Sequence, residues 1–222
     1  MSNYRVSRNY ENLQRNIFDG VGQYDIPAID PIHIQDVPLF IGFNYAKGCI
    51  NPGKRGLHFF LDDYQFIRVW TNPDEYLDMM WKFKYVMSPD FSTYTDFPRA
   101  IQIYNHYRKH WLAAYWQAND IKVIPTISWS DESSFEWCFD GEPVGGVVAV
   151  SSVGTQANKA TKEGFLRGYN EMLERLKPEL ILFNGKVPEE CEGNIKHIGS
   201  FQERLSALGK QNDDGKTEEG TV

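Results

Sequence analysis

Seven short apolar runs, separated by stretches of helical character, constrain the fold of this 222-residue chain more than any other feature. Several runs are apolar throughout, which is typical of parallel strands that are covered on both faces. The expected strands are LFIGFNY (39–45), LHFFLD (57–62), KYVM (84–87), VIPTIS (123–128), VVAVSS (147–152), LILFN (180–184) and IKHIG (195–199). Pro125 lies inside the fourth run, so we expect a bulge or an edge there, because proline donates no ladder hydrogen bond.

The stretches between the runs predict helices over residues 73–83, 98–119 and 159–177, with a short one near 131–139. In the second helix, aromatic and aliphatic residues recur at three- and four-residue steps, which predicts one buried face. These residues are Ile101, Tyr104, Tyr107, Trp111 and Tyr115. In the third helix, the buried face is expected to hold Phe165, Tyr169, Met172, Leu173 and Leu176.

The alternation of strands and helices favours an α/β domain built from right-handed parallel crossovers. Eight-fold barrels typically need about 250 residues, so we expect a small or incomplete TIM-barrel-like sheet, with an open doubly wound sheet as the alternative. Residues 1–36, which glycines and prolines interrupt, predict an N-terminal arm. Residues 37–201 would form the domain, and the polar residues 202–222 a disordered tail.

The composition restricts the classes of partner. A formal net charge of −7 disfavours nucleic acid as a partner, because phosphate neutralisation needs a basic surface. The 3 cysteines are far apart and form no C-x-x-C pair, which suits a reducing compartment, and we expect a cytoplasmic protein. No apolar stretch is long enough for a bilayer, so we expect no membrane partner.

Polar residues follow the predicted strands, and parallel strands bring their carboxyl ends to one rim, where ligands bind in both fold types. We therefore expect a polar small-molecule or nucleotide-like ligand there. The candidate catalytic residues are Asp62, Asp90, Asp131 and Lys186. The candidate ligand-binding residues are Asn44, Tyr45, Ser88, Ser128, Trp129, Ser151, Ser152 and Asn184. Trp129 is expected either to stack against a ring or to pack in the core.

Simpler structural roles compete with each of these assignments. Asp131 precedes a helix and suits an N-cap, and Asp96 before Pro98 suits a cap even better. Ser151 and Ser152 can satisfy backbone groups at a turn, and Asn184 with Gly185 can form an Asn-Gly turn. Six of the predicted strands end in polar residues, and this coincidence supports a common site more strongly than any single residue does.

Asp62 and Asp90 end neighbouring predicted strands, which in a parallel sheet lie about 4.8 Å apart. Two carboxylates at that separation share a proton, a cation or a water, and one pKa rises. They are the first candidates for acid–base chemistry or for binding a divalent metal ion. Asp62 and Asp63 point opposite ways in an extended strand, so at most one faces the rim. Lys186 is the candidate partner for their charge or for an anionic substrate group.

Several familiar motifs do not occur. There is no nicotinamide fingerprint G-x-G-x-x-G after a strand, no P-loop, no H-E-x-x-H and no nucleophile elbow. The cofactor is therefore left open. His106 and His110 have a spacing that can bind a metal, but within NHYRKHW we favour a solvated basic edge, and we assign no metal ligand.

The sequence blocks resemble a bacterial and phage family, domain of unknown function 4417, from about Phe18 to Ile198. The blocks are FIGFNYAK, HFFLDDYQFIRVW, KYVMSPDFSTYTDFP, IYNHYRKHWLAAYWQ, VIPTISWSDESSFEWCFDG, VVAVSSVGTQ and GKVPEEC. The resemblance implies a protein of Gram-positive bacteria, their phages and mobile elements, and it implies no reaction.

Two functions follow as hypotheses. The first is a hydrolase or group transferase that acts on a nucleotide- or sugar-like ligand at the rim. The alternative is a non-catalytic mobile-element protein that binds a host or phage macromolecule through the aromatic and basic helix around NHYRKHW.

Overall fold

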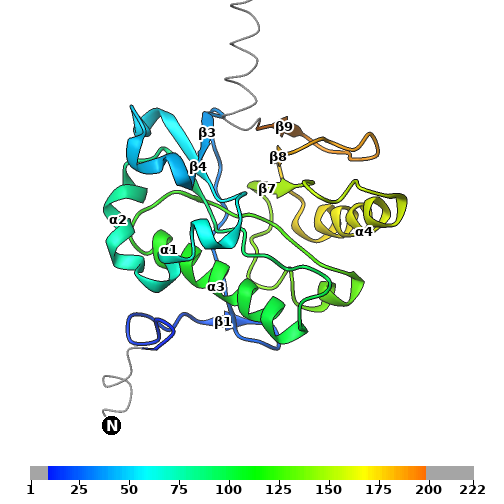
Figure 1. Ribbon diagram of the computed structural model, residues 1–222, viewed down its shortest axis with the longest axis horizontal. Coiled ribbons are helices and arrows are strands. Elements are labelled where there is room, and N and C mark those ends of the chain that lie inside the picture. The colour runs from blue at the N-terminus through cyan, green and yellow to red at the C-terminus, as the bar shows by residue number, and fades with distance from the viewer. Residues whose placement is uncertain (1–9, 199–222) are drawn as a thin grey trace, which may run out of the picture.

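The computed structural model describes residues 10–198 as an α/β structure with parallel sheets (Figure 1). The expected tail at 202–222 lies outside the described residues. All seven predicted strands are present, and most are shorter than their apolar runs. They are β3 (Leu39–Gly42), β4 (Arg55–His58), β5 (Tyr85–Met87), β6 (Val123–Ile124), β7 (Val147–Ser151), β8 (Leu180–Asn184) and β9 (Ile195–His197).

The strands follow one another in sequence order. One sheet has the order β3-β4-β5-β6 and the next β7-β8-β9, and every strand pair in both is parallel. An isolated parallel bridge between Thr126 and Ala149 connects β6 to β7. No pairing closes β9 onto β3 within residues 10–198, so the sheet is incomplete and open.

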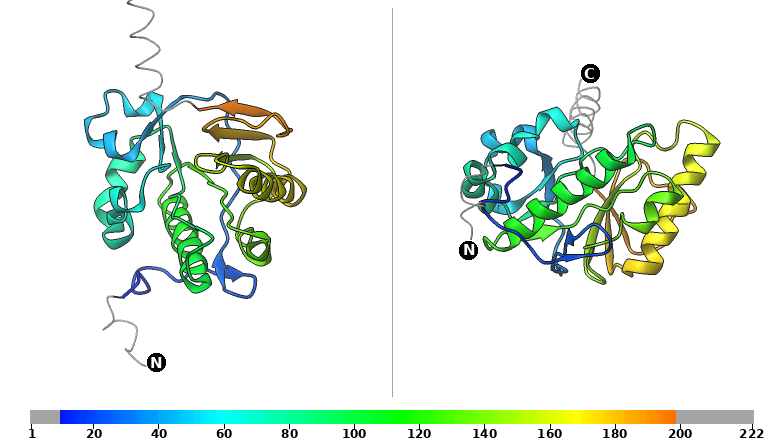
Figure 2. Two further views of the ribbon diagram at one scale, coloured as in Figure 1. Left: turned by 45° about the vertical axis from the view of Figure 1, so that its right-hand side comes forward. Right: turned by 90° about the horizontal axis from the view of Figure 1, so that it is seen from below.

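Helices cover one face of this sheet. They are α1 (Arg68–Thr71), α2 (Pro73–Trp81), α3 (Arg99–Gln117) and α4 (Lys159–Leu176). The helices α1, α2 and α3 share a core with alternate residues of β3 to β6, whereas α4 packs on β7 and β8 (Figure 2). Within residues 10–198, four short 3-10 helices lie between these elements: η2 (Phe43–Gly48), η3 (Pro52–Lys54), η4 (Asp63–Gln65) and η5 (Glu132–Glu136).

The opposite face of the sheet packs largely against itself. Phe40 of β3 and Leu182 of β8 belong to one buried cluster with residues of β5, β6 and β7. Strands that far apart in the order share a cluster only if the sheet curls. Ile32 and Ile34, which precede β3, pack against the same cluster. A doubly wound sheet has helices on both faces, so the structure favours the incomplete curled sheet.

Pro125 directly follows β6, and its backbone faces β7, so its missing N–H lies on that side. On the β5 side, Ser88 pairs with the next residue, Thr126. The Ser88 hydroxyl accepts from Thr126 N at 2.8 Å, and the Thr126 hydroxyl donates to Ser88 O at 2.9 Å. On the other side, Pro125 O accepts from Ala149 N at 2.8 Å. Ser88 thus pairs with Thr126 through its side chain. Strand β6 is the last strand of its four-stranded sheet, and an isolated bridge leads on to β7, so the edge expected at Pro125 is confirmed.

The N-terminal segment contains a small hairpin that the sequence did not predict. Strands β1 (Gly20–Val21) and β2 (Ile26–Pro27) are antiparallel and lie beside α3 (Figure 1). The chain then runs along the start of β7, where Ile32 O accepts from Val147 N at 2.9 Å. This segment therefore covers the amino end of the sheet, opposite the rim expected to bind ligands.

The burial of α3 differs from its predicted pattern. Trp111 is buried, but Ile101 is 45% exposed and the three tyrosines are only half-buried. The interior side of α3 carries polar groups instead, including His106, Lys109 and His110, which are at most 2% exposed. The prediction of a solvated basic edge is therefore wrong. Helix α4 buries its expected face, with Leu173 at the margin.

None of the helices within residues 10–198 combines the length and the apolar character that crossing a bilayer requires.

Candidate functional site

A cleft of about 1000 Å³ opens beyond the carboxyl ends of β5, β6 and β7. Its walls are the loop after β5, the loop leading into η5, the turn after β7 and the first turns of α4. Five of the twelve predicted site residues line it, namely Asp90, Ser128, Trp129, Asp131 and Ser151. The ends of β5, β6 and β7, in the middle of the strand order, therefore converge on one cleft, as expected of the whole rim.

Asp90 is the most unusual group in this cleft. It follows β5 by three residues and is half-buried. Its carboxyl has no hydrogen bond or ion pair within residues 10–198. Burial raises its pKa to about 7, the charge of Asp63 adds to the rise, and the charge of Lys109 opposes it. A carboxyl group with that pKa can both give and accept a proton near neutral pH.

Two side chains anchor the loop that carries Asp90. The Asp63 carboxylate accepts from Ser92 N at 3.2 Å and from its hydroxyl at 2.9 Å. Asn105 of α3 donates to Ser92 O at 2.6 Å. Because Ser92 is held from two elements, the backbone two residues after Asp90 has little freedom. The site is thus preorganised by the helix and by the loop after β4.

Asp62 does not form the expected pair with Asp90. It is exposed at the N-cap position of η4 and does not line the cleft. Its neighbour Asp63 is the residue whose charge acts on Asp90. The chain leaves the strand direction after His58, four residues earlier than the sequence suggested, so alternation along a strand no longer applies at Asp62.

Trp129 forms a wall of the cleft. Its indole lies against Gly168 of α4, at the position that a side chain on residue 168 would occupy. The ring also packs at 5.3 Å, centroid to centroid, from Phe165. Trp129 is half-buried, so it combines the two expected roles: part of the ring is core and part faces the cleft.

Asp131 serves as the N-cap of η5, as the simpler reading of the sequence expected. Its carboxylate accepts from Ser133 N at 2.9 Å and also from the Ser133 hydroxyl. Asp96 caps no helix. The N-cap of α3 is Pro98, which makes no side-chain bond, and Asp96 lines the cleft instead.

Around β7 and β8, three predicted residues support the rim. The Ser151 hydroxyl accepts from Asn184 Nδ2 at 3.1 Å and from Val153 N at 3.3 Å. Ser152 is buried and donates to the backbone carbonyl of Lys186 at 2.6 Å. Of these residues only Ser151 lines the cleft, and Lys186 is exposed outside it.

The remaining predicted residues lie elsewhere. Asn44 and Tyr45 are exposed at the end of β3, in η2. Ser88 is buried and serves the Pro125 junction. The structure thus does not bring the whole rim together at one cleft.

The sequence did not identify Arg167 and Glu132 as cleft residues. They form an ion pair across it, from α4 and η5. Arg167 lies near the middle of a helix, and the strand-end rule has no signal for such a position. Gly168, next to Arg167, is the available sequence signal, because it marks the place where Trp129 approaches α4 closely.

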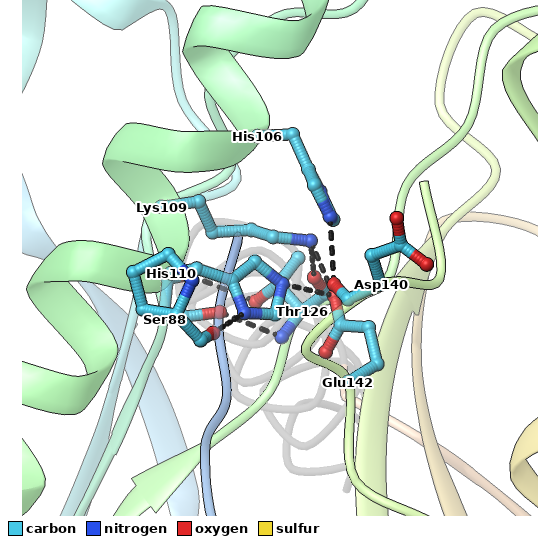
Figure 3. A network of polar contacts seen from close by, with 8 residues as sticks. Ser88, His106, Lys109, His110, Thr126, Asp140 and Glu142 are labelled. Carbon is cyan, nitrogen blue, oxygen red and sulfur yellow. Dashed lines mark hydrogen bonds and ion pairs between the residues drawn. The ribbon is translucent and has the colours of Figure 1, made fainter. Parts of the chain in front are cut away.

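A second polar cluster is buried between α3 and the loop after η5 (Figure 3). Lys109 Nζ donates to Glu142 Oε1 at 2.5 Å and to Thr126 O at 2.9 Å. His110 Nε2 lies 3.0 Å from the same Glu142 oxygen, and its Nδ1 lies 2.9 Å from Pro27 O. Burial raises the pKa of the Glu142 carboxyl, but the charges of Lys109 and His110 outweigh it and leave that pKa below its ordinary value.

The cluster joins four segments of the chain. His106 Nε2 lies 3.0 Å from Asp140 O, and burial keeps the pKa of this imidazole well below its ordinary value. Gly141 has φ +76, and a side chain there would collide with Pro27 O and His110 Nδ1. The network thus clamps the N-terminal hairpin, α3, β6 and the loop after η5 together.

His106, His110 and Glu142 place ligand atoms within 4.8 Å of one another, a spacing that a metal ion can bridge. Here the Lys109 ammonium already contacts the Glu142 carboxylate and supplies the positive charge that a metal ion would supply. The described contacts therefore assign the cluster a structural role.

Comparisons with known proteins place the chain among phage proteins. The model of domain of unknown function 4417 (DUF4417) matches residues 18–202, nearly the span over which the resemblance was seen. The Gene 1 protein of Mycobacterium phage L5 is 39% identical over 176 residues, which are 78% of this chain and 76% of that protein. The Gene 1 protein of Mycobacterium phage D29 is 38% identical over 209 residues, 92% of this chain and 76% of that protein. No solved structure matches the chain.

Proposed function

The chain belongs to the family DUF4417, and we propose that it is an enzyme, a hydrolase or group transferase that acts on a polar ligand in the cleft beyond β5, β6 and β7. One observation carries the proposal. Asp90 presents to this cleft a shielded carboxyl group without a hydrogen-bond partner within residues 10–198, with a pKa of about 7. Carboxyl groups without a chemical role are normally exposed or paired, because burying an unpaired one is costly.

The chemistry follows from that pKa. Near pH 7 the Asp90 carboxyl group is present in both forms. The carboxylate form takes a proton from the attacking water or acceptor hydroxyl as the oxygen of that molecule bonds to the reacting centre. The carboxyl group so formed then gives this proton to the leaving-group oxygen as the bond between the reacting centre and that oxygen breaks. One residue can therefore serve both proton transfers, and Asp63 and Lys109 set its pKa from opposite directions.

The surroundings of Asp90 suit a ligand with a ring and several polar groups. Trp129 supplies an apolar wall, and Ser128 and Ser151 supply hydroxyls on the adjacent strand ends. The cleft volume lies at the upper end of the range of small-molecule sites. Most pockets of this kind combine apolar walls with a few fixed polar groups.

The test compares wild-type protein with Asp90→Asn in a cellular metabolite extract, followed by mass spectrometry at pH 6, 7 and 8. We expect at least one compound to be consumed by the wild type and left intact by Asp90→Asn. Asp78→Asn is the matched control, since Asp78 is exposed on α2, outside the cleft, and should behave as wild type. If wild type and Asp90→Asn leave identical extracts at all three pH values, the enzymatic proposal is wrong.

The alternative, binding of a macromolecule through the helix around NHYRKHW, is less well supported, because His106, Lys109 and His110 of that stretch are at most 2% exposed.

A further inference from the structure

We infer that the ligand of the cleft is an uncharged saccharide and not a phosphorylated compound. This inference rests on the proposed function, because it concerns the same cleft. It goes further by stating which class of polar, ring-bearing molecule the cleft accepts.

The charges of the cleft argue against an anionic ligand. Asp90, Asp96, Asp131 and Glu132 line it, and Arg167 is the one basic residue among the described residues of its lining. Arg167 is already paired with Glu132, so its charge is largely neutralised. A phosphate group in this cleft would face three further carboxyl groups, and like charges at short range repel.

The N-terminus of α4 does not reverse that balance. A helix N-terminus attracts anions through its free N–H groups. Here Asn158 and Thr161 form a capping box, in which Asn158 Oδ1 accepts from Thr161 N at 3.0 Å and Thr161 Oγ1 accepts from Asn158 N at 3.2 Å. The capping box takes up the N–H groups of Asn158 and Thr161, so this helix end offers an anion fewer backbone donors than an uncapped one.

The aromatic wall suits the C–H face of a sugar ring. Trp129 is immobilised between Gly168 and Phe165, and its remaining exposed part belongs to the cleft lining. A fixed indole offers a flat apolar surface at little entropic cost. The C–H groups on one face of a pyranose match such a surface, while its hydroxyls point sideways to polar groups.

The hydrogen-bonding groups are those that hydroxyls need. Ser151 Oγ accepts two N–H donors, so its lone pairs are engaged and its proton remains available to the cleft. The hydroxyls of Ser128 and Thr93 have no hydrogen bond within residues 10–198. Asp90 adds a group that can accept or donate.

A nucleobase fits this set less well. Its edge is normally read by amide side chains, Arg or backbone groups that lie in the plane of the base. No Asn or Gln side chain lines the described part of the cleft, and Arg167 is engaged. Hydroxyls and carboxyls around an aromatic wall instead match a polyhydroxylated ring.

The test is ligand-observed NMR and calorimetry at pH 7. The probes are glucose, cellobiose, N-acetylglucosamine and its β-1,4 disaccharide, with adenosine, AMP and GMP as competitors. We expect at least one saccharide to bind, with no binding of the monophosphates. Trp129→Ala should weaken saccharide binding at least tenfold and Ser151→Ala about threefold to tenfold. Trp81→Ala, which changes a 68% exposed indole on α2, is the control and should bind as wild type.

The inference is wrong if no saccharide binds, if AMP, GMP or adenosine binds in preference, or if neither cleft variant changes the affinity. Its failure can be told apart from failure of the proposed function. Saccharide binding to wild type and to Asp90→Asn without any turnover would support the ligand class and refute the enzyme. Turnover of a phosphorylated compound that depends on Asp90 would support the enzyme and refute the ligand class.

Discussion

The ammonium group of Lys109 lies 2.5 Å from the Glu142 carboxylate, and both side chains are almost completely buried. Such a pair adds little net stability when intact, but removing one partner leaves a charge without compensation in the interior. We expect Lys109→Met to lower the free energy of unfolding by about 3–5 kcal/mol, measured by urea denaturation.

The double variant Lys109→Met, Glu142→Gln tests whether the pair is coupled. It should recover part of the loss, because Gln is uncharged. Lys159→Met is the control, since Lys159 is 89% exposed in its pair with Glu163, and the change should be less than about 0.5 kcal/mol. Strictly additive losses in the double variant would show that the two groups do not depend on each other.

Replacing Asp90 should stabilise the protein while removing its proposed chemistry. The folded pKa is about 7, against an ordinary value of 3.8. The folded state therefore holds a proton that the unfolded state has released between these two values, and stability falls as pH rises from about 4 to 7. The Asn side chain does not ionise, so its burial does not lower the stability as the pH rises. We expect Asp90→Asn to be about 2–4 kcal/mol more stable than wild type at pH 8 and nearly equal to it at pH 3.5, near the ordinary pKa.

Chemical denaturation at both pH values measures this difference, with Asp78→Asn alongside. An Asp90→Asn variant whose advantage is the same at pH 3.5 and pH 8 would mean that Asp90 ionises normally in the folded protein.

Buried histidines should make the fold less stable in weak acid. Burial lowers the pKa of His58 to about 4 and that of His106 well below its ordinary 6.5. Below pH 6.5 these histidines take up protons in the unfolded chain but stay neutral in the folded chain. The free energy of unfolding therefore falls as the pH drops from 6.5 toward 4. For His58 alone the loss reaches up to about 3 kcal/mol.

We expect His58→Gln to flatten the stability profile between pH 6.5 and pH 4, compared with wild type. His33→Gln serves as the control for replacing a histidine by glutamine, because His33 is 68% exposed. Parallel profiles for wild type and His58→Gln would contradict a neutral, buried His58.

Two glycines of α4, one turn apart, should respond oppositely to alanine. At Gly168 the new methyl group would occupy the position of the Trp129 indole, whereas at Gly164 its nearest neighbour is the flexible end of Arg167 at 3.9 Å. We expect Gly168→Ala to cost about 1–3 kcal/mol through overpacking. Gly164→Ala should gain up to about 1 kcal/mol from helix propensity.

Thermal unfolding of both variants checks the signs, and Trp fluorescence reports on Trp129. If Gly168→Ala is as stable as Gly164→Ala, the indole does not rest against α4 as described.

Sequence patterns predicted the seven strands, the three long helices and the parallel order, because these depend on apolar runs and on proline or glycine boundaries. They failed where tertiary contacts override local pattern. The buried face of α3 is partly polar because Lys109 and His110 compensate Glu142, which lies 33 and 32 residues away. The periodicity of apolar residues along a helix does not reveal such contacts with residues distant in the sequence.

The strand-end rule placed Asp90, Ser128, Trp129 and Ser151 in one cleft, but it failed for Asp62 and Lys186. Strand β4 ends at His58, earlier than its apolar run, so the residues after it leave the sheet direction. The rule considers only residues at strand ends, so it does not identify helix residues such as Arg167, which reach the cleft from the side.

The clamp around Pro27 has a consequence for the order in which the protein is made and completed. His110, which bonds the Pro27 carbonyl, is synthesised 83 residues later, and Val147, which bonds Ile32, emerges later still. On the ribosome the hairpin β1–β2 therefore waits without its partners until most of the sheet exists. Within residues 10–198 the hairpin is the first strand pair to be synthesised and is among the last to gain its native contacts, so a disruption of these strands would affect a late step of folding.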